Sequence, residues 1–378
     1  MSYGPGRMGF GLFVPELKST FALSSSTVGF IASLGFCGFF IGLLVAQSLL
    51  NRMGPKIPVL TGLFAAMTGM SIVALAHNAA TLALGVFLAA SSAGFAWTPF
   101  NDPVHRKIRD WDRPTALSLI STGTSIGVVL AGCAALFLVF ADLPWRYCWA
   151  FFALAGFAAL VLNWSVLRQI DRPPTTETKM PWRALRHPTA IPLFAIAFVY
   201  GATSAIYISF APDKFWAHGG VPGTPTAATP ALVFLCYGLF GLTGLLAGNV
   251  KQAIGLPWIL RLLMLTSAVS LVLVALIPRN WPALIASAGL QGIHVMMTSA
   301  VLAFWSERLF PTLPAFSFTA ALLATAAGSI LGPAAAGMMS DTFSSEAMFI
   351  AAAALPMITA FILRNRHAHE RAATSPEL

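Results

Sequence analysis

Arg7 is the residue whose type and position most strongly indicate a function. It lies in an apolar stretch that ends near Pro15. Arg7 precedes Pro15 by eight residues, which in a helix places it roughly 12 Å inward from that end. A cation at such a depth in a membrane is costly and by default functional. No Asp or Glu occurs at matching depth, so a carboxylate of a ligand, bound bidentately, is one candidate partner. The alternatives are pairing with helix carbonyls or snorkelling to the aqueous face.

His294 is the one histidine deep in an apolar segment. Histidine titrates near neutral pH, which suits a proton carrier. A neutral hydrogen bond to a ligand or to a neighbouring helix explains it equally well. Three carboxylates near segment ends, Glu16, Asp102 and Asp213, are further proton-coupling candidates. For Glu16 and Asp213, which have lysines beside them, ordinary solvated helix-end charges are the simpler interpretation.

The composition shows what must position these residues. The chain has 378 residues, of which 57% are hydrophobic and 9% charged, and its net charge is +9. A soluble domain carries about a quarter of its residues as charged side chains. The composition therefore excludes a soluble enzyme and a disordered chain. It also argues against nucleic-acid binding, which needs basic residues clustered on a water-facing surface. The lipid bilayer is the first expected partner.

Continuous apolar runs of about 20 residues predict membrane-crossing helices, because a β-barrel would show shorter alternating segments. The polar stretch 169–189 divides the runs six and six. We predict an N-terminal six-helix bundle over 1–168, a cytoplasmic linker over 169–189, and a C-terminal six-helix bundle with a short cytoplasmic tail over 190–378. The expected spans are 3–17, 27–50, 57–76, 80–101, 115–139, 146–167, 190–211, 228–250, 257–277, 282–305, 315–339 and 346–363.

The distribution of Lys and Arg predicts the orientation. With the loop after the second helix in the cytoplasm, 17 of the 22 basic residues lie on that side, 4 lie on the other, and Arg7 lies within the first helix. Both termini are then cytoplasmic, and the expected location is the plasma membrane, the inner membrane of a bacterium. Nothing in the sequence matches a catalytic, cofactor-binding or metal-binding motif, so we expect a protein that is no enzyme and needs no cofactor or metal.

The two halves of the chain echo each other in three places, in the same order. Phe13-Val14-Pro15-Glu16 recurs as Phe210-Ala211-Pro212-Asp213, 197 positions on. The segment from Gln47 to Gly54 recurs as Gly248 to Gly255, and Gly123-x-x-x-Gly127 as Gly328-x-x-x-Gly332. Duplicated six-helix halves are typical of secondary transporters, which bind their substrate near mid-membrane between the halves.

The sequence resembles the major facilitator superfamily along its whole length. The loop after the second helix is similar to the Gly-x-x-x-Asp-Arg-x-Gly-x-Arg/Lys signature of that family, with Asn51 in place of Asp and Gln47 in place of Gly. Because of these departures, the charge relay attributed to that loop is in doubt. The resemblance implies an all-α membrane protein of twelve transmembrane helices in two pseudo-symmetric bundles, acting as a monomer. The residues of the implied gating loop are Gln47, Asn51, Arg52, Gly54 and Lys56.

In this family helices one, four, seven and ten line the central cavity, and each carries a polar face here at helical spacing. The resulting substrate-binding candidates are Arg7, Phe10, Ser91, Phe95, Thr98, Asn101, Tyr200, Thr203, Ser204, Tyr207, Gln291, His294 and Thr298. The competing interpretation is that Ser and Thr bond their own backbone and that Tyr packs between helices.

Two function classes follow, with a third more distant. The first is a secondary active transporter, a symporter of a small organic anion and protons. The second is an efflux pump for apolar or cationic compounds, with an aromatic pocket that includes Trp97 and Trp305. The third is a non-transporting membrane sensor. The first expected helix has only about 15 residues, so we also expect that the true start lies upstream or that this helix is short and thins the bilayer.

Overall fold

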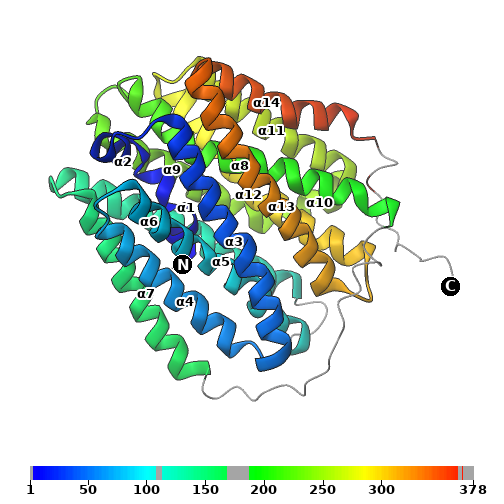
Figure 1. The fold of residues 1–378 in the computed structure, drawn as a ribbon. Helices are drawn as coiled ribbons and strands as arrows, with labels where there is room; N and C mark the ends of the chain where they lie inside the picture. Colours follow the sequence, from blue (N-terminus) through cyan, green and yellow to red (C-terminus); the bar gives the residue numbers. More distant parts are fainter. Residues whose placement is uncertain (1–2, 108–112, 168–186, 365–367, 369–378) are drawn as a thin grey trace.

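The structure, a computed structural model, describes residues 3–107, 113–167, 187–364 and 368. These residues form fourteen α-helices, three short 3₁₀ turns and no strand. In the first half the helices are α1 Tyr3–Leu12, α2 Val14–Phe21, α3 Ser25–Met53, α4 Lys56–Ala74, α5 Ala79–Lys107, α6 Arg113–Phe140 and α7 Trp145–Leu167. In the second half they are α8 Ile191–Ala217, α9 Thr229–Gly241, α10 Ala247–Ile254, α11 Leu256–Leu276, α12 Trp281–Leu309, α13 Pro314–Thr342 and α14 Ser345–Ile362 (Figure 1).

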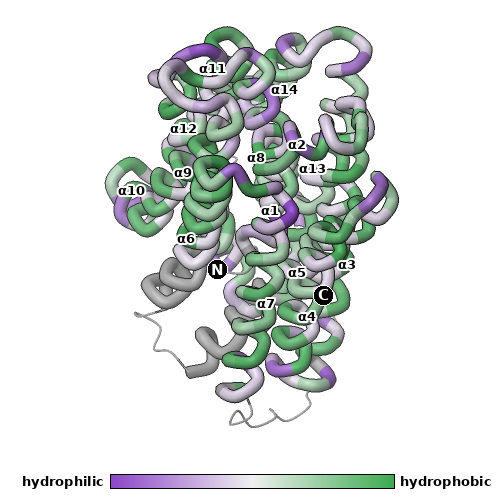
Figure 2. Tube along the Cα trace, turned by 90° about the vertical axis from the view of Figure 1, so that its left-hand side faces the viewer, coloured by the Kyte–Doolittle hydropathy of each residue, from purple (hydrophilic) through white to green (hydrophobic). Residues whose placement is uncertain are grey.

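Each of the twelve predicted spans coincides with one helix or one pair of helices, which confirms the predicted fold class. Ten segments of the described residues are long and apolar enough to cross a membrane. Figure 2 shows hydrophobic residues along the lengths of the helices and hydrophilic ones mainly at their ends. Large apolar side chains such as Phe137 and Phe361 are more than two-thirds exposed, as expected for a surface that faces lipid.

The first expected span is broken into α1 and α2, a difference from the predicted continuous helix over 3–17. Pro15 lies in the first turn of α2. A proline offers no N–H and its ring clashes with the carbonyl four residues earlier, so α1 ends before it. Phe13, between the two helices, has φ −112° and ψ 10°. α2 lies outside the ten apolar segments. It lies at one end of the molecule together with the start of α3 and the end of α6, and we call this end the α2 face.

The eighth expected span, 228–250, is also interrupted. A 3₁₀ turn over Leu242–Leu246 separates α9 from α10. A 3₁₀ segment winds more tightly about its axis than an α-helix, and here Gly241 and Gly244 lie against the side chain of Met296 on α12. A Cβ at either glycine would meet that side chain, so the small residues permit this close approach.

The duplication seen in the sequence is also visible in local geometry. α3 ends at Gly54 with φ 75°, and its N–H donates to the carbonyl of Leu50. At the equivalent place, 201 residues on, α10 ends at Gly255 with φ 81°, and its N–H donates to the carbonyl of Lys251. A positive φ is readily adopted by glycine alone. The same sharp turn therefore joins equivalent helices in both bundles.

The two bundles are in tight contact at the α2 face. Three glycines there have no room for a Cβ: Gly11 lies against the Ile208 carbonyl, Gly29 against Pro333, and Gly337 against Ser25. An ion pair of 2.8 Å joins Lys18 to Asp213 across the same boundary. The structure therefore represents a state in which the α2 face is closed.

Candidate functional site

Arg7 extends from α1 to α3, where its guanidinium carbon lies 4.3 Å from the ring centroid of Phe39 and 5.9 Å from that of Phe36. A cation over a ring face keeps its in-plane N–H groups available. The Arg7 Nε is buried without a hydrogen-bond partner, and no carboxylate of the described residues pairs with it. A cavity of about 10 Å³ borders the side chain, which is about the space for one water molecule.

Two phenols of the C-terminal bundle face this cation. Tyr200 on α8 and Tyr237 on α9 lie close enough to Arg7 to interact with it electrostatically, and both are buried. The Tyr237 ring stacks on Tyr207, with centroids 6.4 Å apart and planes at 22°. The Tyr207 hydroxyl lies 3.0 Å from the Ser287 Oγ. The arrangement joins a guanidinium of one bundle to phenol hydroxyls of the other, a set of groups that can bind the oxygens of a small polar solute.

The predicted polar face of α12 is fully buried between α8 and α11. Gln291, His294 and Thr298 each have an exposed fraction of 0%. The His294 Nδ1 lies 2.7 Å from the carbonyl of Leu263, so this nitrogen carries the proton and donates it. Its Nε2 is left as an acceptor without a partner, and neither polar atom of the Gln291 amide is bonded. The ring of Tyr200 meets His294 edge-on at 5.5 Å.

Several other predicted site residues bond their own helix backbone. The Thr203 and Ser204 hydroxyls donate to carbonyls four residues earlier, at 2.9 Å and 2.6 Å. The Ser91 hydroxyl donates to a carbonyl three residues earlier, at 2.7 Å. This is the competing interpretation of such residues. Phe10 and Phe95 are both buried, and Phe10 belongs to the main apolar core. The side chains of Thr98, Asn101 and Asp102 on α5 lie outside the described residues.

The predicted gating loop is the sharp turn between α3 and α4. Gly54 provides its positive φ, and Arg52 is exposed. The Lys56 Nζ lies 5.8 Å from the ring centroid of Trp164 on α7. Gln47 lies in the last two turns of α3, and the side chain of Asn51 lies outside the described residues.

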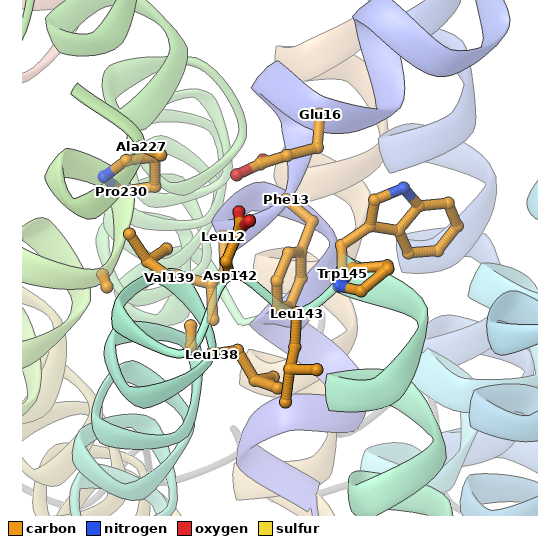
Figure 3. Close-up of a pocket in the computed structure, with 13 residues that line it drawn as sticks. Leu12, Phe13, Glu16, Leu138, Val139, Asp142, Leu143, Trp145, Ala227 and Pro230 are labelled. Carbon is orange, nitrogen blue, oxygen red and sulfur yellow. The ribbon is translucent and has the colours of Figure 1, made fainter. Parts of the chain in front are cut away.

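The carboxylates at the α2 face are less solvated than the sequence indicates. Glu16 directs its carboxylate toward a cavity (Figure 3), and its Oε2 is buried without a hydrogen-bond partner. Burial raises the pKa of Glu16 to about 7, with a smaller increase from the nearby negative charge of Asp213. Lys214 is only 6% exposed and donates to the Ser345 Oγ at 2.9 Å. Helix packing at this face therefore removes the Glu16 Oε2 and the Lys214 side chain from water, which argues against an ordinary solvated charge at Glu16.

Two six-helix bundles that meet around a buried cation are the arrangement of a helical membrane transporter. A sequence profile described as the Major Facilitator Superfamily matches residues 1–214, and the chain belongs to that superfamily. It is 30% identical over 322 residues to the transcription regulatory protein OpdE of Pseudomonas aeruginosa, with 80% of this chain and 76% of that protein covered.

Two solved structures share this fold. The nucleoside transporter NupG, in a mutant form, has a TM-score of 0.74 at 13% identity and covers 96% of this chain and 97% of its own. A bacterial homologue of the human lysosomal transporter Spinster, inward-facing and unoccupied, has a TM-score of 0.74 at 17% identity, covering 100% and 96%. At these identities the likeness establishes the fold alone.

Sequence reasoning missed Tyr237 and Phe39, which both contact the surroundings of Arg7. Tyr237 lies on the eighth expected span, which was not among the helices predicted to line the cavity. Tyrosine is nevertheless rare in this chain, with 5 residues in 378, and three of the five form this cluster. That rarity was the available signal. Phe39 had none, because it is one of 29 phenylalanines.

Proposed function

We propose that this transporter carries a small organic anion and is driven by coupling to protons. The observation that carries the proposal is Arg7, a cation inside the bundle with an unpartnered Nε and no described carboxylate beside it. A guanidinium in such a place binds a carboxylate in bidentate fashion. Tyr200 and Tyr237, near Arg7 on the opposite bundle, would hydrogen-bond the other oxygens of the solute.

Alternating access supplies the mechanism. The cavity beside Arg7 is about 10 Å³, too small for an organic solute, so the bundles must separate for loading. With the positive charges in the cytoplasm, the α2 face is the outer one and opens when the contacts of Gly11, Gly29 and Gly337 part. The solute would be bound near mid-membrane between the halves. The protein would act as a monomer.

The proton would be carried by a group that changes its surroundings during this motion. Glu16 fits this role best, because its pKa of about 7 lets it titrate at physiological pH, and it lies beside the Lys18–Asp213 ion pair. His294 and Asp102 remain candidates. The hydrogen bond from the His294 Nδ1 to Leu263 supports the alternative role for His294, that of a neutral donor that fixes α12 against α11.

The decisive experiment is ligand-dependent thermal stabilisation of the purified protein across carboxylates, sugars, amines and drugs. We expect carboxylates to stabilise the wild type, and we expect Arg7→Ala to lose this effect. Arg279→Ala, which removes an exposed arginine, is the matched control and should bind normally. Stabilisation by cations alone would instead favour the efflux pump. For the coupling, His294→Gln with an unchanged pH dependence of uptake would remove His294 as the proton site.

A second function is favoured by one comparison. The relative from Pseudomonas aeruginosa is named a transcription regulatory protein, which accords with a membrane sensor that binds a solute without carrying it. The two functions differ in one measurement. A transporter in proteoliposomes accumulates the stabilising carboxylate when a proton gradient is imposed, whereas a sensor binds the same ligand with no net uptake.

A further inference from the structure

A second cavity lies at the α2 face, beside Leu12 and Phe13 at the end of α1. It measures about 250 Å³ and is lined by residues of both bundles. One side of it is supplied by α1, α2, α6 and the start of α7. The other side is supplied by Ala227, in the turn before α9, and by Pro230 and Ala231 at the start of α9. Asp142, Leu143 and Pro144 on its rim are exposed, so the cavity is accessible from the aqueous phase.

Two carboxylates enter this cavity from different elements. Glu16 comes from α2 and Asp142 from the connection between α6 and α7, and their oxygens point toward the same space (Figure 3). The Oε2 of Glu16 is buried and has no hydrogen-bond partner. Among the described residues, no lysine or arginine lines the cavity. The nearby Lys18 is paired with Asp213 at 2.8 Å, and Arg146 donates to the carbonyl of Ala76 at 2.8 Å.

The rest of the wall is apolar and partly aromatic. Phe13, Leu138, Trp145 and Pro230 are among the lining side chains, and Figure 3 shows the Phe13 ring and the Trp145 indole on the same side of the cavity. Negative charge with an aromatic and aliphatic wall is complementary to a cation that has an apolar body. An inorganic cation would leave the apolar wall without a partner, and an anion would be repelled by both carboxylates.

We propose that this cavity is a binding site for an organic ammonium ion with an apolar body, separate from the central site at Arg7. The ammonium group lies between Glu16 and Asp142 and donates to both carboxylates. The apolar body lies between Phe13 of the N-terminal bundle and Pro230 of the C-terminal bundle. Because such a ligand touches both bundles, it binds only while the α2 face is closed and shifts the protein toward that state.

The site is also sensitive to pH. Glu16 titrates near pH 7 because of its burial, and a protonated Glu16 no longer attracts a cation. The charged groups around it are Lys18 on α2, Asp213 on α8 and Asp142 after α6. Affinity for the ammonium ion therefore increases as the pH rises from 6 to 8.

The test is isothermal titration calorimetry of the purified full chain with 2-phenylethylammonium at pH 8. The neutral 2-phenylethanol, of nearly the same shape, is the ligand control. We expect the alcohol to bind at least tenfold more weakly. Glu16→Gln and Asp142→Asn should each lower the affinity at least fivefold, and Glu16→Gln should also abolish its rise between pH 6 and 8. Asparagine tolerates the positive φ of 52° at position 142, so the fold is kept.

Two further variants separate this site from others. Glu346→Gln removes an exposed acidic residue of the same face and should leave the affinity unchanged. Arg7→Ala should also leave it unchanged, because the two sites are distinct. Equal binding of the alcohol and the ammonium ion would overturn the proposal, as would normal affinity in both Glu16→Gln and Asp142→Asn. Loss of binding in Arg7→Ala would also overturn it, since it would place the ammonium ion in the central site.

Discussion

A methyl group at Gly29 should open the α2 face. The carbonyl of Pro333 on α13 occupies the place where a Cβ of residue 29 would lie, so Gly29→Ala forces α3 and α13 apart. Overpacking of this kind costs about 1–3 kcal/mol. The contact joins the two bundles and exists only while this face is closed, so the cost falls on that state alone. The population of the open state relative to the closed one should rise about 5- to 150-fold.

The assay is the labelling rate of a cysteine introduced at Ser209, which is 2% exposed and borders the cavity next to Arg7. The background replaces the four native cysteines, which are free. A water-soluble thiol reagent added from the side of the α2 face reaches position 209 only when the bundles separate there. Gly29→Ala should label at least fivefold faster than the parent protein.

Two controls make this prediction decisive. At Gly248 a Cβ would meet nothing within 4 Å, so Gly248→Ala should label at the parent rate. Gly69→Ala introduces a similar clash between α4 and α5 within one bundle, and it should lower thermal stability without faster labelling. An unchanged rate in a folded Gly29→Ala protein would refute the argument that close helix contact holds this face shut.

Three further predictions concern charged groups at the same face. In a double-mutant cycle with thermal unfolding as the readout, Lys18→Ala and Asp213→Ala should show a coupling free energy of about 0.5–1 kcal/mol, because the pair is partly exposed. A coupling of zero would mean that the ion pair does not hold the bundles together. Asp341 accepts hydrogen bonds from the N–H groups of Ser25 and Ser26 at 3.1 Å and 2.7 Å. Asp341→Ala should therefore lower the free energy of unfolding by about 1 kcal/mol, as the loss of other helix caps does. An unchanged melting temperature would contradict this. The pKa of Glu16 is raised from 4.5 to about 7, so its contribution to stability is fully present below pH 4.5 and is lost as the pH rises through 7. The melting temperature of Glu16→Gln should therefore exceed that of the wild type at pH 8 and differ little from it at pH 4.5. An equal difference at both pH values would be inconsistent with the raised pKa.

Much of the fold could be predicted because membrane helices carry their own signal. Each span must be apolar over its whole length, so the twelve segments were recognisable without knowledge of their neighbours. The breaks were harder to predict. Pro15 and Pro212 occupy equivalent places in the repeat, yet Pro15 separates two helices and Pro212 lies inside α8. The same residue type gives both outcomes, because packing decides whether the chain continues past a proline.

The candidate site was only partly predictable. Arg7 was identifiable because a cation within an apolar run is exceptional in any arrangement of the helices. The surroundings of Arg7 were not, since neither Phe39 nor the rare tyrosine Tyr237 shows in the sequence which residue it will meet until folding brings α3 and α9 beside α1. Hydroxyl residues such as Thr203 gave a polar face in the sequence, but the structure bonds their side chains to their own helix.

By itself, the sequence determined the class of this protein. Its composition, its apolar runs and its internal duplication specify a membrane protein of paired six-helix bundles, since these features depend on residue type and order alone. The tertiary structure decided which charges leave water. Glu16 and Lys214 look like solvated helix ends in the sequence, and only helix packing at the α2 face buries the Lys214 side chain and the Glu16 Oε2. Burial depends on neighbours distant along the chain, which no local pattern of residues records.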